Sequence, residues 1–207
     1  MSSIVTRVSN NIPESKKCFA RAENYIHTAE SIDSELSSFL KLKDMYNMAN
    51  IEEAEHNLTR AEQTLNLALE LNKDRAYGRA RIVRHKAVIL IEKGECHKAI
   101  KHLKEIEKVA ENFENKLNLA KIKRQLGIAY GRQHNYKQAV RYLKTALKIS
   151  EKLCYRDDFL WDCFHLFKLY LSLGNGKDAD YYRKLAQEIL IELEIPGKCP
   201  IFEISLH

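Results

Sequence analysis

The sequence predicts an all-α protein built as an array of about four to five antiparallel helix hairpins. The first observation is a repeat of 40 residues, in which matching positions return at Ala99, Ala139 and Ala179 and at Leu90, Tyr130 and Tyr170. The second is that no proline occurs between Pro13 and Pro196, although a proline inside a helix costs about 3 kcal/mol. The third is that apolar residues recur at three- and four-residue steps, which is the period of a helix.

The same apolar spacing locates the individual helices. They are predicted at about residues 14–31, 35–48, 51–71, 74–93, 97–112, 116–133, 136–153, 157–173 and 177–193. Asn135, Asp157 and either Asn175 or Lys177 stand where helix caps or tight turns are expected. Gly94 and Gly174 can adopt the left-handed conformation that ends a helix. The connections are therefore short, as in stacked hairpins.

Positive charge is concentrated in the middle of the chain. The formal net charge of the 207 residues is +6, but residues 61–150 alone hold 20 Lys and Arg against nine Asp and Glu. Between Ala120 and Lys144 there are seven basic residues and no acidic one. Such a field attracts an acidic peptide, a phosphate or a nucleic acid.

Several classes of protein are disfavoured by the sequence. No apolar run approaches the roughly 18 residues that span a bilayer, and the start MSSIVTRVSN lacks the apolar centre of a secretory signal. We therefore expect a cytoplasmic protein without a membrane partner. The five cysteines are odd in number and scattered, which fits reduced thiols better than a disulfide framework.

No catalytic, metal or cofactor site is predicted. Cys96 with His97, and Cys163 with His165, are close in sequence but lack the spacing of a zinc site. A nucleophile at Cys96 or Cys163 would need a histidine supplied by the fold. The glycines of GNGKDAD follow no strand, so they do not form a phosphate-binding loop.

The clearest repeat unit is LGIAYGRQHNYKQAVRYLKTALKI, residues 126–149. It resembles the tetratricopeptide repeat, whose first helix is matched by Leu126, Gly127 and Tyr130 and whose second helix is matched by Ala139, Leu143 and Ala146. The resemblance covers nearly all of residues 14–194 and implies a right-handed superhelical solenoid. It divides the chain into an N-terminal segment 1–13, a repeat domain 14–194 and an apolar C-terminal tail 195–207.

The period of 40 residues is longer than the common period of 34 in this family. In that respect it is reminiscent of kinesin light chains and of the peptide-sensing regulators of Gram-positive bacteria and their phages. The tail, IPGKCPIFEISLH, is expected to cap the last hairpin or to lie in the groove of its own or a neighbouring chain. The second arrangement would produce self-association.

In tetratricopeptide arrays the first helix of each hairpin lines the concave face, so the resemblance assigns candidate partner-binding residues here. They are Arg81, Arg84, Val88, Lys121, Arg124, Ile128, Arg132, Trp161, Phe164 and Lys168. Arg84 and Arg124 are expected to hold carboxylates, because guanidinium groups bind them in pairs. Trp161 and Phe164 are expected to anchor an apolar side chain.

These observations together predict a non-enzymatic scaffold or adaptor that binds a protein or peptide with an acidic segment in a basic concave groove. One alternative is a peptide-responsive regulatory protein of the bacterial tetratricopeptide type. Another is an RNA- or DNA-binding helical-repeat protein, which would need aromatic side chains among the basic ones. A purely solvated basic face also stays open at this point.

Overall fold

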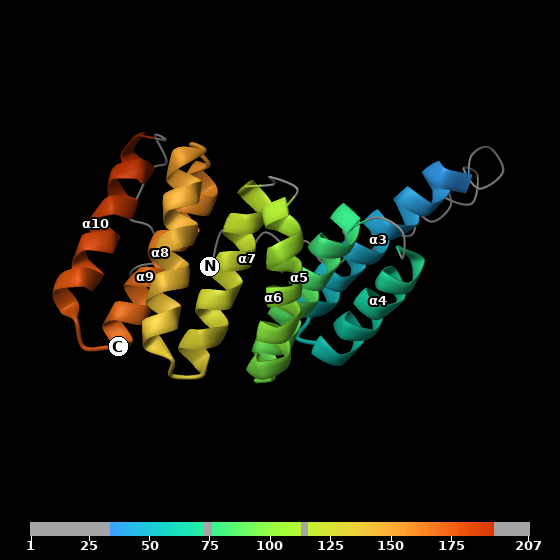
Figure 1. Ribbon diagram of the computed structural model, residues 1–207, viewed down its shortest axis with the longest axis horizontal. Coiled ribbons are helices and arrows are strands. Elements are labelled where there is room, and N and C mark those ends of the chain that lie inside the picture. The colour runs from blue at the N-terminus through green and yellow to red at the C-terminus, as the bar shows by residue number, and fades with distance from the viewer. Residues whose placement is uncertain (1–33, 73–75, 113–115, 193–207) are drawn as a thin grey trace. The chain divides into compact units, whose positions relative to one another are not determined.

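The computed structural model describes residues 34–72, 76–112 and 116–192, and within them it contains eight helices and no strand (Figure 1). The helices are α3 (Ser34–Ala54), α4 (Leu58–Leu71), α5 (Ala76–Glu92), α6 (Cys96–Asn112), α7 (Lys116–Arg132), α8 (Tyr136–Lys152), α9 (Arg156–Ser172) and α10 (Gly176–Glu192). The predicted all-α array of hairpins is confirmed. The predicted helix at 14–31 and the tail 195–207 lie outside the described residues.

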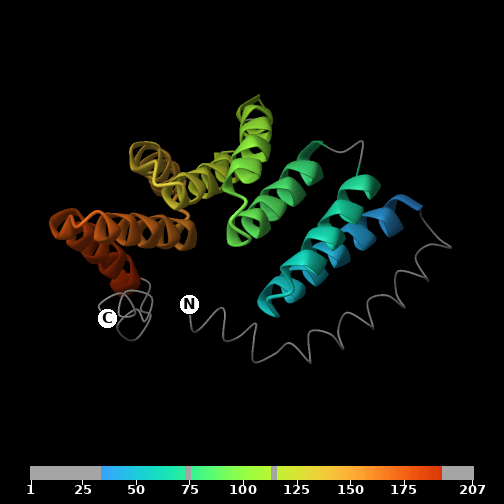
Figure 2. The same ribbon diagram turned by 90° about the horizontal axis from the view of Figure 1, so that it is seen from below.

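The chain divides between Lys93 and Gly94 into two compact units. The described helices of the first unit are α3, α4 and α5, and α4 packs against both of the others. The second unit holds α6 to α10, in which successive helices pack side by side (Figure 2). None of the helices in the described residues is long and apolar enough to cross a membrane.

The helices from α5 to α10 follow a regular spacing that is half the sequence repeat. Each of them has 17 residues, and each begins 20 residues after the one before. One repeat of the sequence is therefore one pair of helices. Within the second unit, equivalent side chains of α6 and α8, and of α7 and α9, consequently occupy equivalent positions along their helices.

The turns between helices reuse one backbone conformation. Gly94 and Gly174 have φ of 81° and 69°, as the sequence predicted, and His134 has φ of 60° at the equivalent position. After α7 the His134 amide donates to the Gly131 carbonyl at 3.0 Å and the Asn135 amide donates to the Tyr130 carbonyl at 2.9 Å. These bonds satisfy carbonyls that the end of a helix leaves without partners. The predicted cap at Asn135 is confirmed, since its side chain accepts from the Gln138 amide.

The predicted boundary between the helices at 35–48 and 51–71 is wrong. Helix α3 continues to Ala54, and the turn comes later, at His56, whose φ is 59°. The chain passes through Asn50 without a break because its side-chain amide donates to the Tyr46 carbonyl at 3.0 Å. Asn57 then caps α4 by accepting from the Arg60 amide.

The core of the second unit is an apolar cluster of buried residues from α8, α9 and α10, against which partly buried side chains of α7 pack. Its members share near-complete burial, and the largest are Leu143, Phe159, Phe164, Leu166, Phe167, Tyr170 and Tyr182. A pair of stacked tyrosines repeats in this unit: Tyr130 with Tyr142 and Tyr170 with Tyr182 both have ring centroids 5.6 Å apart and planes at 9°. The sequence repeat is therefore also a repeat of side-chain packing.

Close approach of α7 and α8 depends on the absence of a side chain at Gly127. A Cβ atom there would lie 2.6 Å from Leu143 Cγ and 3.2 Å from the Ala139 carbonyl oxygen. One turn later, a Cβ at Gly131 would have its nearest neighbour, Leu169 Cδ1, at an ordinary 3.6 Å. Gly127 is therefore required for the close packing of α7 against α8, whereas the position of Gly131 has room for a methyl group.

We predict that Gly127→Ala lowers the free energy of unfolding by about 1 to 3 kcal/mol, because Leu143 must move to admit the methyl group. The matched control is Gly131→Ala, which is expected to raise the free energy of unfolding by up to about 1 kcal/mol, since alanine is the better helix former. Urea unfolding followed by circular dichroism measures both. Equal effects of the two substitutions would show that α7 and α8 are not packed as closely as described.

Candidate partner-binding surface

Helices α7 and α9 lie next to each other in the second unit, although α8 separates them in the sequence. Lys121 Nζ is 3.5 Å from Asp158 Oδ2, and Arg124 Nε is 2.6 Å from Asp162 Oδ1. In both contacts the residue of α9 follows its partner in α7 by slightly less than one 40-residue repeat of the sequence. The two helices therefore run in parallel.

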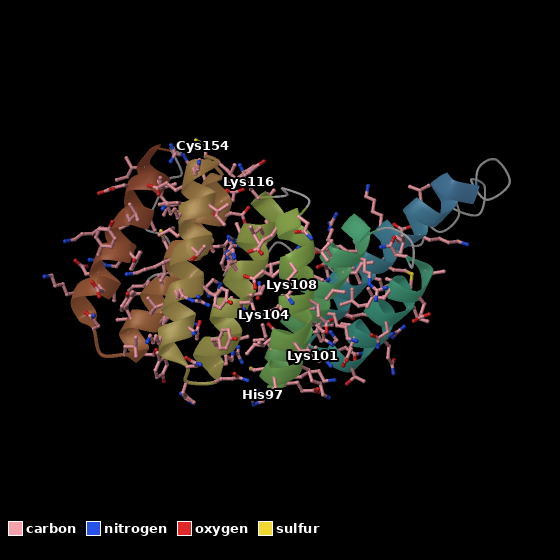
Figure 3. The ribbon with its side chains drawn as sticks, in the orientation of Figure 1. His97, Lys101, Lys104, Lys108, Lys116 and Cys154 are labelled. Atoms are coloured by element: carbon pink, nitrogen blue, oxygen red, sulfur yellow. The ribbon has the colours of Figure 1, made fainter. Side chains whose placement is uncertain are left out.

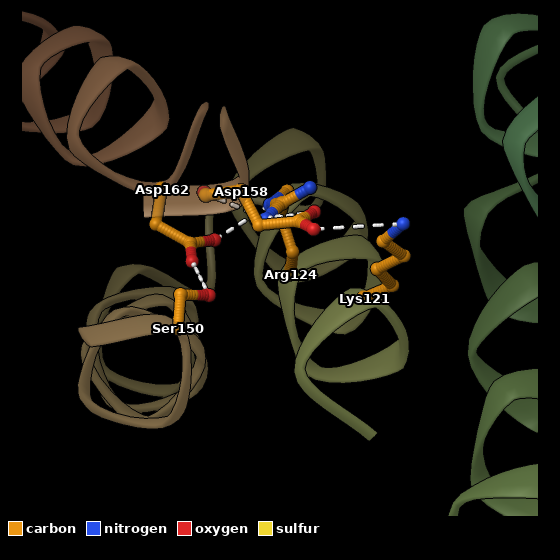
Figure 4. Close-up of polar contacts among 5 residues, drawn as sticks. All are labelled: Lys121, Arg124, Ser150, Asp158 and Asp162. Atoms are coloured by element: carbon orange, nitrogen blue, oxygen red, sulfur yellow. Dashed lines mark hydrogen bonds and ion pairs between the residues drawn. The ribbon is translucent and has the colours of Figure 1, made fainter. Parts of the chain in front are cut away.

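Arg124 is the centre of this pairing (Figure 4). Its Nε donates to Asp162 at 2.6 Å, and its NH2 group donates to the Asp158 carboxylate at 2.9 Å and to the Asp158 carbonyl at 2.8 Å. The second oxygen of Asp162 accepts from the Ser150 hydroxyl of α8 at 2.7 Å. Asp162 and Ser150 are both 0% exposed, so the polar groups of three helices satisfy one another inside the protein.

This geometry corrects the expectation that Arg124 holds a carboxylate of a partner. The Arg124 side chain is only 9% exposed, and its guanidinium group already binds two carboxylates of its own chain. Burial alone would lower the pKa of Arg124, but the hydrogen bonds and charges of Asp162 and Asp158 raise it above its ordinary value. The charge therefore stays on Arg124 and serves the interior. Lys121 is also paired, through Asp158, although a third of its side chain is exposed.

The aromatic residues predicted on α9 form a cluster with a histidine that the sequence analysis did not assign to it. The Trp161 ring lies 5.8 Å from that of Phe164 and 6.1 Å from that of His165. Phe164 is 5% exposed and belongs to the core, so the expectation that it contacts a partner directly is corrected as well. Trp161 is half-buried, and Lys168 is exposed with its Nζ 5.4 Å from the Phe164 ring centroid.

His165 is uncharged at neutral pH. Burial first, and then the positive charges of Arg124 and Lys168, lower the pKa of its imidazole to about 3. A neutral ring stacked on Trp161 makes this part of α9 an apolar surface with a polar edge.

The remaining candidates on α7 are accessible. Ile128 is half-buried against the core, and Arg132 is exposed at the last turn of the helix. Arg132 and Lys168 form no ion pair within the part of the chain that the structure describes. We call the set Ile128, Arg132, Trp161 and Lys168 the α7–α9 face.

Three candidates lie in the first unit and are described apart from the others. Arg81 is exposed, and its guanidinium carbon lies 4.2 Å from the centroid of the Tyr46 ring of α3. Val88 and Arg84 are half-buried, and the Nε of Arg84 is buried without a hydrogen-bond partner among the described residues. The same ring of Tyr46 lies 4.9 Å from that of His85, which contacts Glu53 at 2.7 Å.

The carboxylates Asp158 and Asp162 and the hydroxyl of Ser150 were not identified as interaction partners from the sequence. Asp157 and Asp158 lie in the first turn of α9, where the helix N-terminus alone is enough to favour acidic residues. A usable signal was present at Asp162, because it lies between the apolar Trp161 and Cys163 at a position that the helical period makes a core position. A buried acid demands a basic partner.

Two groups of residue types that often take part in catalysis were located in the described residues. The described residues contain no group of three or more His, Cys, Asp or Glu side chains that could hold a metal ion. Cys163 is completely buried, and burial raises the pKa of its thiol far above the ordinary value, so a thiolate nucleophile does not form there. Cys154 is exposed in the turn before α9.

Comparison with protein families gives one match, to the tetratricopeptide repeat, over residues 78–152. The chain is a tetratricopeptide-like helical repeat protein. Comparison with curated protein sequences gives no match. Several solved structures share the fold, and the resemblance that the sequence predicted is therefore confirmed.

Three of these structures illustrate the likeness. The tetratricopeptide-like repeats of a putative kinesin light chain from Podosopora anserina share 15% identity, with a TM-score of 0.63 over 93% of this chain and 95% of theirs. The apo form of RapI shares 18% identity, with a TM-score of 0.69 over 91% of this chain and 72% of RapI. Aspartyl phosphate phosphatase F from Bacillus subtilis shares 15% identity and a TM-score of 0.69, over 91% of this chain and 50% of the phosphatase. At these identities the likeness establishes the fold alone.

We predict that Arg124→Ala lowers the free energy of unfolding by about 3 to 5 kcal/mol, because it leaves Asp162 as a buried charge without a counter-charge. The control is Lys121→Ala, which removes a partly exposed partner of Asp158 and should cost less than about 1 kcal/mol. Urea unfolding measures both. The ion pair would have no structural role if the Arg124 variant were as stable as the Lys121 variant.

We also predict that acid destabilises the protein through His165. Its folded pKa of about 3 lies below the unfolded value of 6.5, so between these pH values the unfolded chain binds more protons. As the pH is lowered through this range, the free energy of unfolding should therefore decrease by up to about 1.4 kcal/mol per pH unit from this residue alone. Unfolding titrations of wild type and His165→Leu at several pH values measure the difference. Parallel pH profiles would show that His165 titrates normally in the folded protein.

Proposed function

We propose that this protein is a non-enzymatic scaffold that binds a peptide segment of a partner protein on the α7–α9 face. The tetratricopeptide-like repeat fold supports a role in protein interaction. Proteins with this fold are typically non-enzymatic. The observation that carries the finer proposal is that half-buried Trp161 and the exposed cation Lys168, both on α9, each contact the ring of Phe164. An aromatic anchor next to a charge is typical of a binding hot spot.

Charge supports a partner with an acidic segment, but fewer cations are available than the sequence suggested. Arg124 and Lys121 are paired with Asp158 and Asp162 inside the second unit. Arg132 and Lys168 are exposed at the surface, and an acidic peptide would neutralise them. We infer that an apolar side chain of the peptide packs on Trp161 while a nearby carboxylate of the peptide binds Lys168.

The buried network contributes to this function through rigidity. Because Arg124 ties α7 to α9, the side chains of the α7–α9 face keep their spacing in the absence of the peptide. A preorganised surface loses less conformational entropy on binding. Only the peptide then has to become ordered.

A second candidate is a peptide-responsive regulator of the bacterial type to which the repeat length pointed. The likeness of the fold to RapI and to aspartyl phosphate phosphatase F favours it, because each is matched over 91% of this chain. In a regulator, peptide binding would change the arrangement of the repeats, whereas a scaffold would keep it. Small-angle scattering with and without a bound peptide distinguishes the two by the change in radius of gyration.

We predict that peptides selected by the full chain from a random display library are rich in Asp and Glu around one large apolar residue. Trp161→Ala should weaken the selected peptides at least about thirtyfold, which corresponds to the roughly 2 kcal/mol of a hot spot. Lys168→Gln should weaken acidic peptides more than versions in which the acids are replaced by amides. Fluorescence anisotropy of labelled peptides measures these affinities.

Tyr181→Ala provides the matched control, since Tyr181 is an exposed aromatic residue of α10, 59% exposed and away from the α7–α9 face. It should bind the selected peptides as wild type does. Unchanged affinity of Trp161→Ala, or an equal loss with Tyr181→Ala, would contradict the assignment of this face.

A further inference from the structure

A second surface of the same unit carries basic residues in two matching rows. In α6 and α8 the residues at four equivalent positions of the repeat lie on one side of each helix, because they are spaced by four, three and four residues. They are His97, Lys101, Lys104 and Lys108 in α6, and Lys137, Arg141, Lys144 and Lys148 in α8. We call them the α6–α8 basic surface. Figure 3 shows the α6 row along the length of its helix.

The two rows meet at one side chain. Lys104 Nζ lies 4.8 Å from the centroid of the Tyr142 ring, and the guanidinium carbon of Arg141 lies 4.8 Å from the same centroid. Lys104 also donates a hydrogen bond to the Tyr142 hydroxyl. Cations from neighbouring helices thus converge on Tyr142, and the rows form one continuous surface.

Within the described residues, Lys104 is the one cation of this surface that is paired with an acid. Glu151, at the end of α8, is the only acid in that helix. In α6, Glu107 contacts Lys104 and Lys123, and Glu105 is 3.8 Å from His102. Burial by itself would lower the pKa of Lys104, but Tyr142 and Glu107 raise it, so this lysine stays charged. Lys101, Lys108, Lys137 and Lys148 form no ion pair within the described residues.

The positive rows are not a general property of exposed helix faces in this protein. The same four positions, counted from the left-handed turn that precedes each helix, have other side chains in α4 and α10. They are Thr59, Gln63, Asn66 and Glu70 in α4, and Lys177, Tyr181, Lys184 and Glu188 in α10. Among these four helices, only α6 and α8 have a basic side chain at all four positions.

The side chains of the α6–α8 basic surface favour one class of partner over the others. None of the large hydrophobic side chains that are exposed in the described residues belongs to α6 or α8. An interface with a folded protein normally has aromatic or aliphatic anchors, a membrane-surface helix inserts apolar side chains, and a single strand stacks its bases on aromatic rings. Lysines without such neighbours suit the phosphates of a duplex, which a protein can bind through charge alone.

We propose that the α6–α8 basic surface binds the phosphate backbone of double-stranded nucleic acid without regard to base sequence. Each row, from its first to its last residue, is about 16 Å long, because a helix rises about 1.5 Å per residue. Several phosphates of a duplex lie within that length. The surface is distinct from the α7–α9 face, and the inference does not rest on the function proposed above.

The test uses the full chain and a fluorescein-labelled duplex of 24 base pairs with mixed sequence. Anisotropy titrations at several salt concentrations give the affinity and its salt dependence. Replacement of Lys101, Arg141 and Lys148 together by Gln should weaken binding at least about tenfold at 100 mM salt. It should also reduce the slope of log K against log salt by about three, because each contact to a phosphate contributes about one.

The matched control replaces three exposed lysines elsewhere, Lys43, Lys177 and Lys184, by Gln. It changes the net charge of the chain by the same amount and should leave the affinity and the slope near those of wild type. Circular dichroism verifies that both variants keep their helices. Equal losses in the two variants would mean attraction to net charge only, and would overturn the proposal.

Three further results would also overturn it. One is the absence of duplex binding by wild type at 100 mM salt. Another is tighter binding of the corresponding single strand. The third is tighter binding of polyglutamate or of vesicles that contain phosphatidylserine, abolished by the same three substitutions, which would assign the surface to an acidic protein or a membrane.

Discussion

The ion pair between Arg124 and Asp162 is the interaction on which the arrangement of the second unit depends. Most packing in a helical array joins helices that follow each other along the chain, as α7 joins α8 and α8 joins α9. Arg124 instead connects α7 directly to α9, and Ser150 brings α8 into the same network. The relative register of three helices is thus tied to one guanidinium group.

A buried ion pair adds little net stability, because removing both charges from water costs about as much as their attraction returns. Its effect here is on geometry. Apolar residues such as Leu166 and Ala139 would pack acceptably over a range of small shifts between helices, whereas Arg124 needs Asp158 and Asp162 at fixed distances and angles. The network therefore selects one spacing of α7 and α9.

The positive charge of the middle of the chain is divided between two different uses. Lys121, Lys123 and Arg124, which lie within four residues of the sequence, all bind carboxylates within the second unit. Lys101 and Lys148 lie on the outer side of α6 and α8 and are exposed. Tyr142 contacts residues of both kinds of surroundings: its ring stacks on Tyr130 of α7, and Lys104 and Arg141 of the basic surface lie next to the same ring. Charge density along the sequence therefore says little about which surface is positive.

The sequence by itself determined the helical class, the repeat and most of the turns, because these depend on residues close together in the chain. Gly94 and Asn135 act on the backbone within a few residues of themselves, and the apolar period records which side of each helix is buried. The helical period also placed Arg124 and Ile128 on one side of α7, but could not reveal that Asp162, 38 residues away, neutralises the arginine. Even the misplaced turn before α4 had this origin, since Asn50 bonds within its own helix instead of ending it. Only the tertiary structure decided which charges meet, because an ion pair depends on the register between helices, and no single helix contains that information.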